Sequence, residues 1–129
     1  MNTLEMLTTN LQATRAAYTT RIGLVAEMVK AETRLTADRL ELEAAKVAIL
    51  TANADDPKAL GGNEAARSAR LADLTAEEAR RVQASAAVVD ALRAELEMAR
   101  LECRLADLTL QHLTAMDATR GDVEMERAA

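Results

Sequence analysis

The chain has 129 residues, a length that fits one domain, and half of them are apolar although Tyr18 is the only aromatic residue. Leu, Ala, Met and Val fill the seams between packed helices, and no β-branched run is long enough for a strand, so the composition predicts an all-α fold. The net charge of −5 argues against a protein whose whole surface binds nucleic acid.

Several features bear on the compartment. The single Cys103 cannot form an intramolecular disulfide, which indicates a reducing environment. The first residues lack a basic region followed by a continuous apolar region, so no signal peptide is expected. No run of about 18 apolar residues occurs, so no membrane span is expected. We therefore expect a cytoplasmic protein without a membrane partner.

The first predicted helix covers residues 2–52, and Asn2 and Glu5 have the spacing of a capping pair at its start. It would be about 75 Å long and needs a partner helix of similar length. One stripe follows an eleven-residue period, which favours a nearly straight pairing with that partner. A second stripe repeats every seven residues and widens the apolar face. The first stripe contains Leu7, Leu11, Thr14, Tyr18, Ile22, Val25, Val29, Thr33, Thr36, Leu40, Ala44, Val47 and Thr51; the second contains Met28, Leu35, Leu42 and Ile49.

A turn is predicted at residues 53–62, which hold Pro57 and the Gly61–Gly62 pair. The second helix is predicted at 63–119, with Asn63 as its N-cap. A capping-box match at Thr75–Glu78 leaves two alternatives, a separate short helix at 63–73 or one continuous helix, and we favour the continuous helix. A polar tail at 120–129 follows, and 1–129 is expected to form a single domain.

The second helix carries two apolar seams with seven-residue spacing. Leu92 and Leu101, one from each seam, are nine residues apart and therefore lie about 180° apart on the helix. A long antiparallel hairpin, similar to a coiled coil, covers one seam; we expect contacting residue numbers to add up to about 117, as in Val25 with Leu92. The first seam is Val82, Ser85, Val89, Leu92, Leu96, Ala99, Cys103, Ala106, Leu110 and Leu113; the second is Ala94, Met98, Leu101, Leu105, Leu108, His112 and Ala115.

The second seam needs another cover, because apolar side chains left in water forfeit burial energy and form an unusually large exposed patch. Pairing of two hairpins into a four-helix bundle supplies that cover. The alternative is a different protein partner. The residues expected in the oligomer interface are Met98, Leu101, Leu105, Leu108, His112, Met28, Leu35 and Leu42.

No residue pattern predicts catalysis or a cofactor. His112 is the only imidazole and has no nearby nucleophile or orienting acid in the sequence, so we interpret it as a packed or rim residue. Cys103 lies in an apolar seam, and no basic residue shares its face of the helix to activate it. No Glu-x-x-His occurs, so a carboxylate-bridged metal site is not expected. The sequence favours a protein that is not an enzyme.

Basic residues gather near the predicted turn. They can form a small patch for phosphate groups or nucleic acid, or they can simply solvate the helix ends beside Asp55, Asp56 and Glu64, and we favour the second interpretation. No aromatic side chain is present there to stack on a base. The residues concerned are Lys58, Arg67, Arg70, Arg80 and Arg81, with Lys46 close by.

The segment GGNEAARSARLADLTAEE follows an Asp- and Pro-containing turn and enters a long Ala/Leu/Glu/Arg helix. It resembles small coiled-coil or helical-hairpin proteins of bacteriophages and prophages, in which an Asn-Glu-x-x-Arg step joins two helices; here these residues are Asn63, Glu64 and Arg67. The resemblance implies a phage-type accessory protein in the host cytoplasm. We therefore expect a structural or protein-interaction module that self-associates, and as the alternative a nucleic-acid accessory factor that binds through the basic tip.

Overall fold

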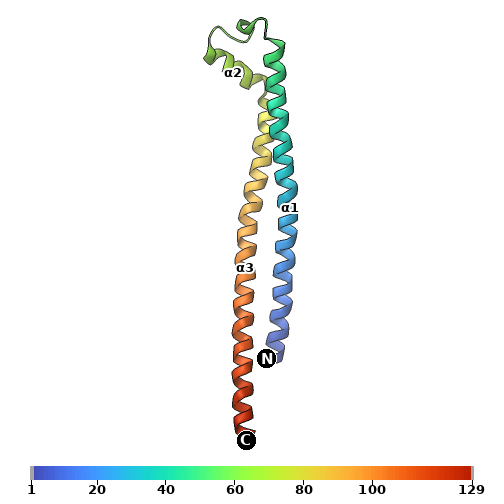
Figure 1. The fold of residues 1–129 in the computed structure, drawn as a ribbon, viewed down its shortest axis with the longest axis vertical. Helices are drawn as coiled ribbons and strands as arrows, with labels where there is room; N and C mark the ends of the chain where they lie inside the picture. The colour runs from blue at the N-terminus through green and yellow to red at the C-terminus, as the bar shows by residue number, and fades with distance from the viewer. Residues whose placement is uncertain (1, 129) are drawn as a thin grey trace. The chain divides into compact units, whose positions relative to one another are not determined.

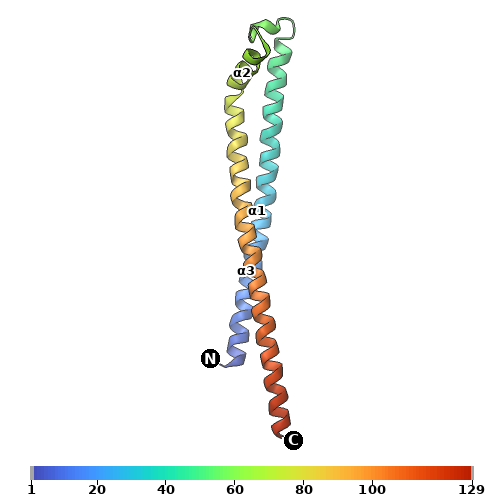
Figure 2. The same ribbon diagram turned by 90° about the vertical axis from the view of Figure 1, so that its left-hand side faces the viewer.

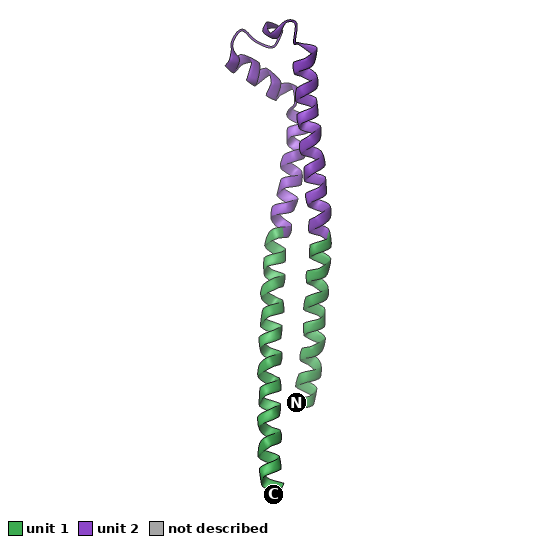
Figure 3. Ribbon diagram, viewed as in Figure 1, with its two compact units in different colours: residues 1–26, 93–129 green, residues 27–92 purple. Residues whose placement is uncertain are grey.

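The computed structural model describes residues 2–128, and this part of the chain is helical without any strand. Helix α1 spans Thr3–Ala52, a short 3-10 helix spans Pro57–Ala59, α2 spans Glu64–Leu74 and α3 spans Ala76–Ala128. Helices α1 and α3 run antiparallel and pack as a hairpin (Figure 1). The chain divides into two compact units (Figure 3): unit 1 is residues 1–26 with 93–129, and unit 2 is residues 27–92.

The predicted capping pair, Asn2 and Glu5, caps the start of α1. The Glu5 backbone N–H donates to Asn2 Oδ1 at 2.8 Å, and the Asn2 N–H donates to the Glu5 carboxylate at 3.3 Å. These reciprocal bonds satisfy two donors at the helix start that have no partner within the helix itself. Strong helix formers then carry α1 to Ala52, the residue at which its end was predicted.

The turn between α1 and α2 is compact. Leu60 is buried, and its N–H donates to the Pro57 carbonyl oxygen at 3.2 Å. Asn63 caps α2, since its side-chain oxygen accepts from the Ala66 N–H at 2.8 Å. Gly61 is required by close approach: a Cβ on Gly61 would lie 2.8 Å from the Ala66 Cβ and from the Arg67 backbone nitrogen. A side chain at Gly61 would therefore push the turn away from α2.

The prediction of one continuous helix over 63–119 is wrong, because α2 ends at Leu74 and α3 begins at Ala76. Thr75 between them is only 1% exposed, and its hydroxyl donates to the Leu71 carbonyl oxygen at 2.8 Å. The backbone of Thr75, with φ −111° and ψ 16°, leaves helical geometry, and this ends α2. Within unit 2, α2 consequently turns off the direction of α3 (Figures 1 and 2), and the alternative of a separate short helix describes this segment.

The predicted end of the second helix near residue 119 is also wrong, because α3 continues through Gly121 to Ala128. A helical Gly costs only about 1 kcal/mol relative to Ala, which is too little to end a helix of this length. Arg120 supports the segment by pairing with Glu124 one turn away, Nε to Oε1 at 3.3 Å. The polar tail predicted at 120–129 is therefore helical as far as it is described, and Ala129 lies outside the described residues.

The seam between α1 and α3 follows a seven-residue repeat on both helices. On α3 the buried residues include Val89, Leu96, Ala99, Cys103 and Leu113, which confirms the first predicted seam. On α1 the inward face is the stripe that repeats every seven residues, and the eleven-residue stripe that was expected to face the partner is largely exposed. The inward positions of α1 are Thr3, Leu7, Asn10, Thr14, Ala17, Arg21, Leu24, Met28, Ala31, Leu35, Asp38, Leu42, Ala45 and Ile49.

Unit 2 contains the most compact core. Met28, Ala31 and Leu35 of α1 pack with Val89 of α3, and Val82, Ala86 and Leu92 surround them. Met28 and Leu35 were expected in an oligomer interface, and that prediction is wrong because each is only 8% exposed inside the hairpin. Leu42, two turns beyond Leu35 on the same face, is half-buried. The seven-residue stripe of α1 thus serves the fold of the single chain.

The pairing register differs from the predicted one. Ser85 bonds to Asp38 and Arg81 pairs with Glu41 in unit 2, and in unit 1 Arg120 bonds to Thr3. The residue numbers in these pairs add up to 123, 122 and 123, whereas about 117 was expected. The prediction is wrong because α2 belongs to the connection between the long helices, which moves the centre of the hairpin toward the C-terminus.

Candidate interaction surface

The outward side of α3 in unit 1 carries four large apolar side chains in a row. Met98, Leu101, Leu105 and Leu108 are spaced three and four residues apart, so they share one side of the helix, facing away from the buried Ala99 and Cys103. They are 60%, 59%, 66% and 53% exposed. We call these four residues the α3 ridge, and its members are the core of the sequence-predicted interface.

The apolar side continues toward the C-terminus. His112, also predicted in the interface, is exposed one turn beyond Leu108. With Ala115, Met116 and Val123 it lines a shallow hollow on the surface of α3. Neither Met116 nor Val123 was predicted in the interface; Val123 lies beyond residue 119, where the helix was expected to end. Thr109, Met116 and Val123 are spaced seven residues apart, and this repeat in the sequence indicates that the apolar side of α3 continues toward the C-terminus.

A groove whose α1 side is lined mainly by small residues lies beside the ridge. Its α1 wall is formed by Ala13, Ala16, Ala17 and Thr20, which we call the α1 trough. Its α3 wall is formed by Leu105 of the ridge, Ala106, Thr109 and the side chain of Glu102, and the open groove has a volume of about 500 Å³. The ridge and the trough therefore flank each other on one side of unit 1. Sequence reasoning missed the trough, because a run of Ala and Thr gives no strong apolar signal.

The other flank of α1 in unit 1 carries exposed apolar residues from the stripe that was expected inside. Ile22 and Leu11 are 69% and 54% exposed. Tyr18 lies two residues from Ala16 and Thr20, which places it about 200° away from both around the helix. Its hydroxyl donates to Asp107 Oδ2 at 2.6 Å across the hairpin. A polar contact between α1 and α3 therefore crosses this flank.

The basic residues near the turn are used in different ways. Arg81 pairs with Glu41 at 3.2 Å and with Glu77 at 3.3 Å, and the bond to Glu77 raises the pKa of its guanidinium. Lys46 pairs with Glu43 at 3.8 Å. Lys58, Arg70 and Arg80 are exposed, whereas Arg67 is half-buried and lines a pocket between α1 and α2. The predicted basic residues therefore do not form one continuous patch of unpaired positive side chains.

The two residues that could act as a nucleophile or a base, Cys103 and His112, lie apart from each other. Cys103 is a buried free thiol in the seam, and His112 is exposed on α3. Within residues 2–128 no group of three or more His, Cys, Asp or Glu side chains is placed to hold a metal ion. None of the helices in this range combines the length and apolarity needed to cross a bilayer.

Comparison with known proteins adds no relative: no family model and no curated protein matches the sequence, and no solved structure matches the fold. The resemblance to helical phage proteins, the absence of an enzymatic role and the nucleic-acid alternative stay predictions.

Proposed function

We propose that this protein is a non-enzymatic structural or protein-interaction module that pairs with a second copy of itself through the α3 ridge. The observation that carries the proposal is the exposure of Met98, Leu101, Leu105 and Leu108 in one unbroken row. Monomers rarely expose contiguous apolar patches of this kind without using them for binding. Burying the exposed part of each side chain contributes about 1 kcal/mol or more, and a symmetric pair gains from both copies.

The neighbouring trough supports a second copy as the partner. A two-fold interface brings the same surface of each chain together in opposite order. With ridge and trough side by side, each ridge would lie over the trough of the other copy. Leu101 and Leu105 would then face Ala13 and Ala16, so large side chains would meet small ones and the helices could approach closely. The product would be a four-helix bundle.

Light scattering in solution tests the proposal. We expect wild type to have at least twice the chain mass of 13.9 kDa, and the double variant Leu101→Glu/Leu105→Glu to have the chain mass itself. Ala16→Leu, which fills the trough, should weaken pairing by a separate route. The matched control is Ile22→Glu, since Ile22 is as exposed as Leu105 but lies on the other flank of α1.

Circular dichroism shows whether each variant keeps its helices. A wild-type chain that stays monomeric and helical at about millimolar concentration contradicts the proposal. Loss of pairing in Ile22→Glu, with pairing intact in the ridge variant, would instead assign the interface to the opposite flank.

A further inference from the structure

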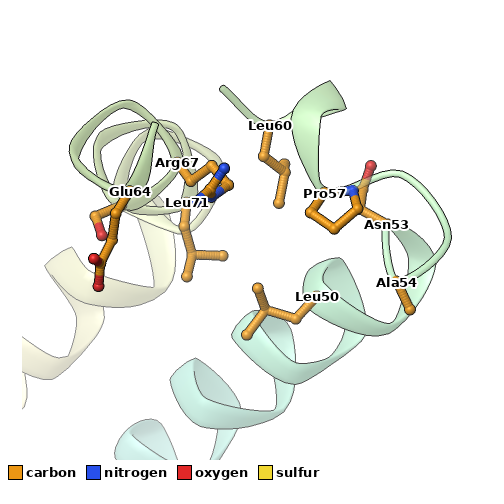
Figure 4. A pocket seen from close by; sticks show the side chains of 9 residues that line it. Leu50, Asn53, Ala54, Pro57, Leu60, Glu64, Arg67 and Leu71 are labelled. Carbon is orange, nitrogen blue, oxygen red and sulfur yellow. The ribbon is translucent and has the colours of Figure 1, made fainter. Parts of the chain in front are cut away.

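A second candidate site lies in unit 2 at the tip of the hairpin. The end of α1, the turn and residues 64–71 of α2 line a pocket of about 250 Å³ (Figure 4). Its walls are mainly apolar, and Leu60 and Leu71 face Leu50 across it. The lining residues are Leu50, Asn53, Ala54, Pro57, Leu60, Glu64, Arg67, Ser68 and Leu71.

Arg67 contributes a positive charge to the lining of this pocket. Its side chain extends from α2 toward the space between α2 and Leu60 (Figure 4). Unlike Lys58, Arg70 and Arg80, which are exposed, Arg67 is half-buried, and no carboxylate pairs with it among residues 2–128. A guanidinium that is partly removed from water without a counter-ion favours an anion, and its planar donors fit a carboxylate or a phosphate.

Size and lining limit the ligand further. Pockets for drug-sized ligands measure about 300–1,000 Å³, so this pocket of about 250 Å³ suits a small ligand. Leu50, Pro57, Leu60 and Leu71 would contact an apolar chain and gain from its removal from water. Glu64 also lines the pocket and disfavours a second negative charge, so the ligand should carry a single one.

We propose that the pocket binds a monocarboxylate with a short apolar chain, whose carboxylate pairs with Arg67 while its chain contacts the leucines and Pro57. The same chemistry is present in a free short-chain acid and in the last residue of a peptide that ends in Leu. This site is independent of the self-association through the α3 ridge.

Calorimetric titration with hexanoate, and with short peptides ending in Leu, tests the proposal and separates the two sources of the ligand. We expect saturable binding of hexanoate or of the free-carboxylate peptide, and at least about tenfold weaker binding of hexanol and of the amidated peptide. Arg67→Gln should weaken binding about tenfold or more, and Arg67→Lys, which keeps the charge, should weaken it less.

Arg70→Gln is the matched control, because Arg70 lies one turn further along α2 and is exposed. It should leave the affinity unchanged, and Glu64→Gln should leave it unchanged or tighten it. The proposal is overturned if neither acid nor peptide binds wild type at millimolar concentration. It is equally overturned if hexanol binds as well as hexanoate, or if Arg70→Gln weakens binding as much as Arg67→Gln.

Discussion

The position of Tyr18 in the structure differs from the position that its sequence pattern predicts. It belongs to a stripe that was expected to face α3 as core, yet it lies on the flank of α1 and reaches Asp107 through its hydroxyl at 2.6 Å. That hydrogen bond is the main reason that the pKa of Tyr18 is raised; desolvation and the negative charge of Asp107 add to it. A phenol with an apolar ring and a polar end suits such an edge position.

We predict that the phenol of Tyr18 titrates above its usual pKa of about 10 and that Asp107→Asn lowers this pKa toward 10. Since the folded-state pKa is raised, the bond stabilises the fold below pH about 10, and this contribution is lost as pH rises through the folded-state pKa. The chain has one Tyr and no Trp, so tyrosinate absorbance reports this group alone. Asp122→Asn, at an exposed position of α3, is the control, and an equal shift in both variants would contradict the assignment.

At the scale of the helices, the seam of unit 2 contains a buried polar pair. Ser85 of α3 donates to Asp38 of α1, and Arg34 Nε lies 3.6 Å from the same carboxylate. Asp38 and Ser85 are both buried. A polar pair in such a seam costs desolvation, but it is satisfied only when the two helices meet in one register.

We predict that Ser85→Ala lowers the free energy of unfolding by about 1–3 kcal/mol, because Asp38 then stays buried without its hydroxyl donor. The apolar pair Asp38→Leu/Ser85→Ala should recover most of that loss and pair the helices in more than one register. Urea unfolding measures the first effect, and distances between spin labels on α1 and α3 measure the second. Ser68→Ala, at an exposed position, should change stability by less than about 0.5 kcal/mol. A single distance in the double variant would show that the polar pair does not set the register.

The sequence allowed the α3 seam to be predicted residue by residue, but not the α1 seam. On α3 the inward positions are almost all apolar, so pattern and burial agree. On α1 the inward positions include Asn10, Arg21 and Asp38, while Ile22 and Leu11 point outward. Choosing the more apolar stripe therefore selects the wrong face. The correct face depends on which α3 residues it meets, as Asp38 and Ser85 illustrate, and that information is not local.

The candidate surfaces were predictable to different degrees. The α3 ridge follows directly from a helix that is apolar on two opposite sides, because a single hairpin can bury only one of them. Met28 and Leu35 were wrongly included in the predicted interface because the sequence did not reveal which face of α1 points inward. The position of Arg67 at a pocket depends on α2 folding away at Thr75, and a continuous helix would not have brought it beside Leu60.

At the scale of the whole chain, the two units differ in which helices contribute buried residues. In unit 2 both long helices contribute buried residues to one core. In unit 1 the buried residues Leu96, Ala99, Cys103 and Leu113 all come from α3, and no residue of the α1 part, residues 3–26, is fully buried. Asn10 also keeps a buried side-chain oxygen without a hydrogen-bond partner in the described residues. Unit 1 is therefore the part whose stability gains most from a partner on its surface.

We predict that amide hydrogen exchange in residues 3–26 is faster than in residues 27–52 when the protein is dilute, because local opening follows local burial. If the ridge pairs two chains, a tenfold rise in concentration stabilises the paired state by up to about 1.4 kcal/mol and should slow exchange in residues 3–26 by up to about tenfold. Exchange in residues 27–92 should change less, and Leu101→Glu/Leu105→Glu should abolish the concentration dependence.

Exchange mass spectrometry at two concentrations, on wild type and on the ridge variant, measures the exchange rates of these segments. Concentration dependence confined to residues 27–92 would move the interface to unit 2, and the same dependence in the ridge variant would exclude the ridge as its source.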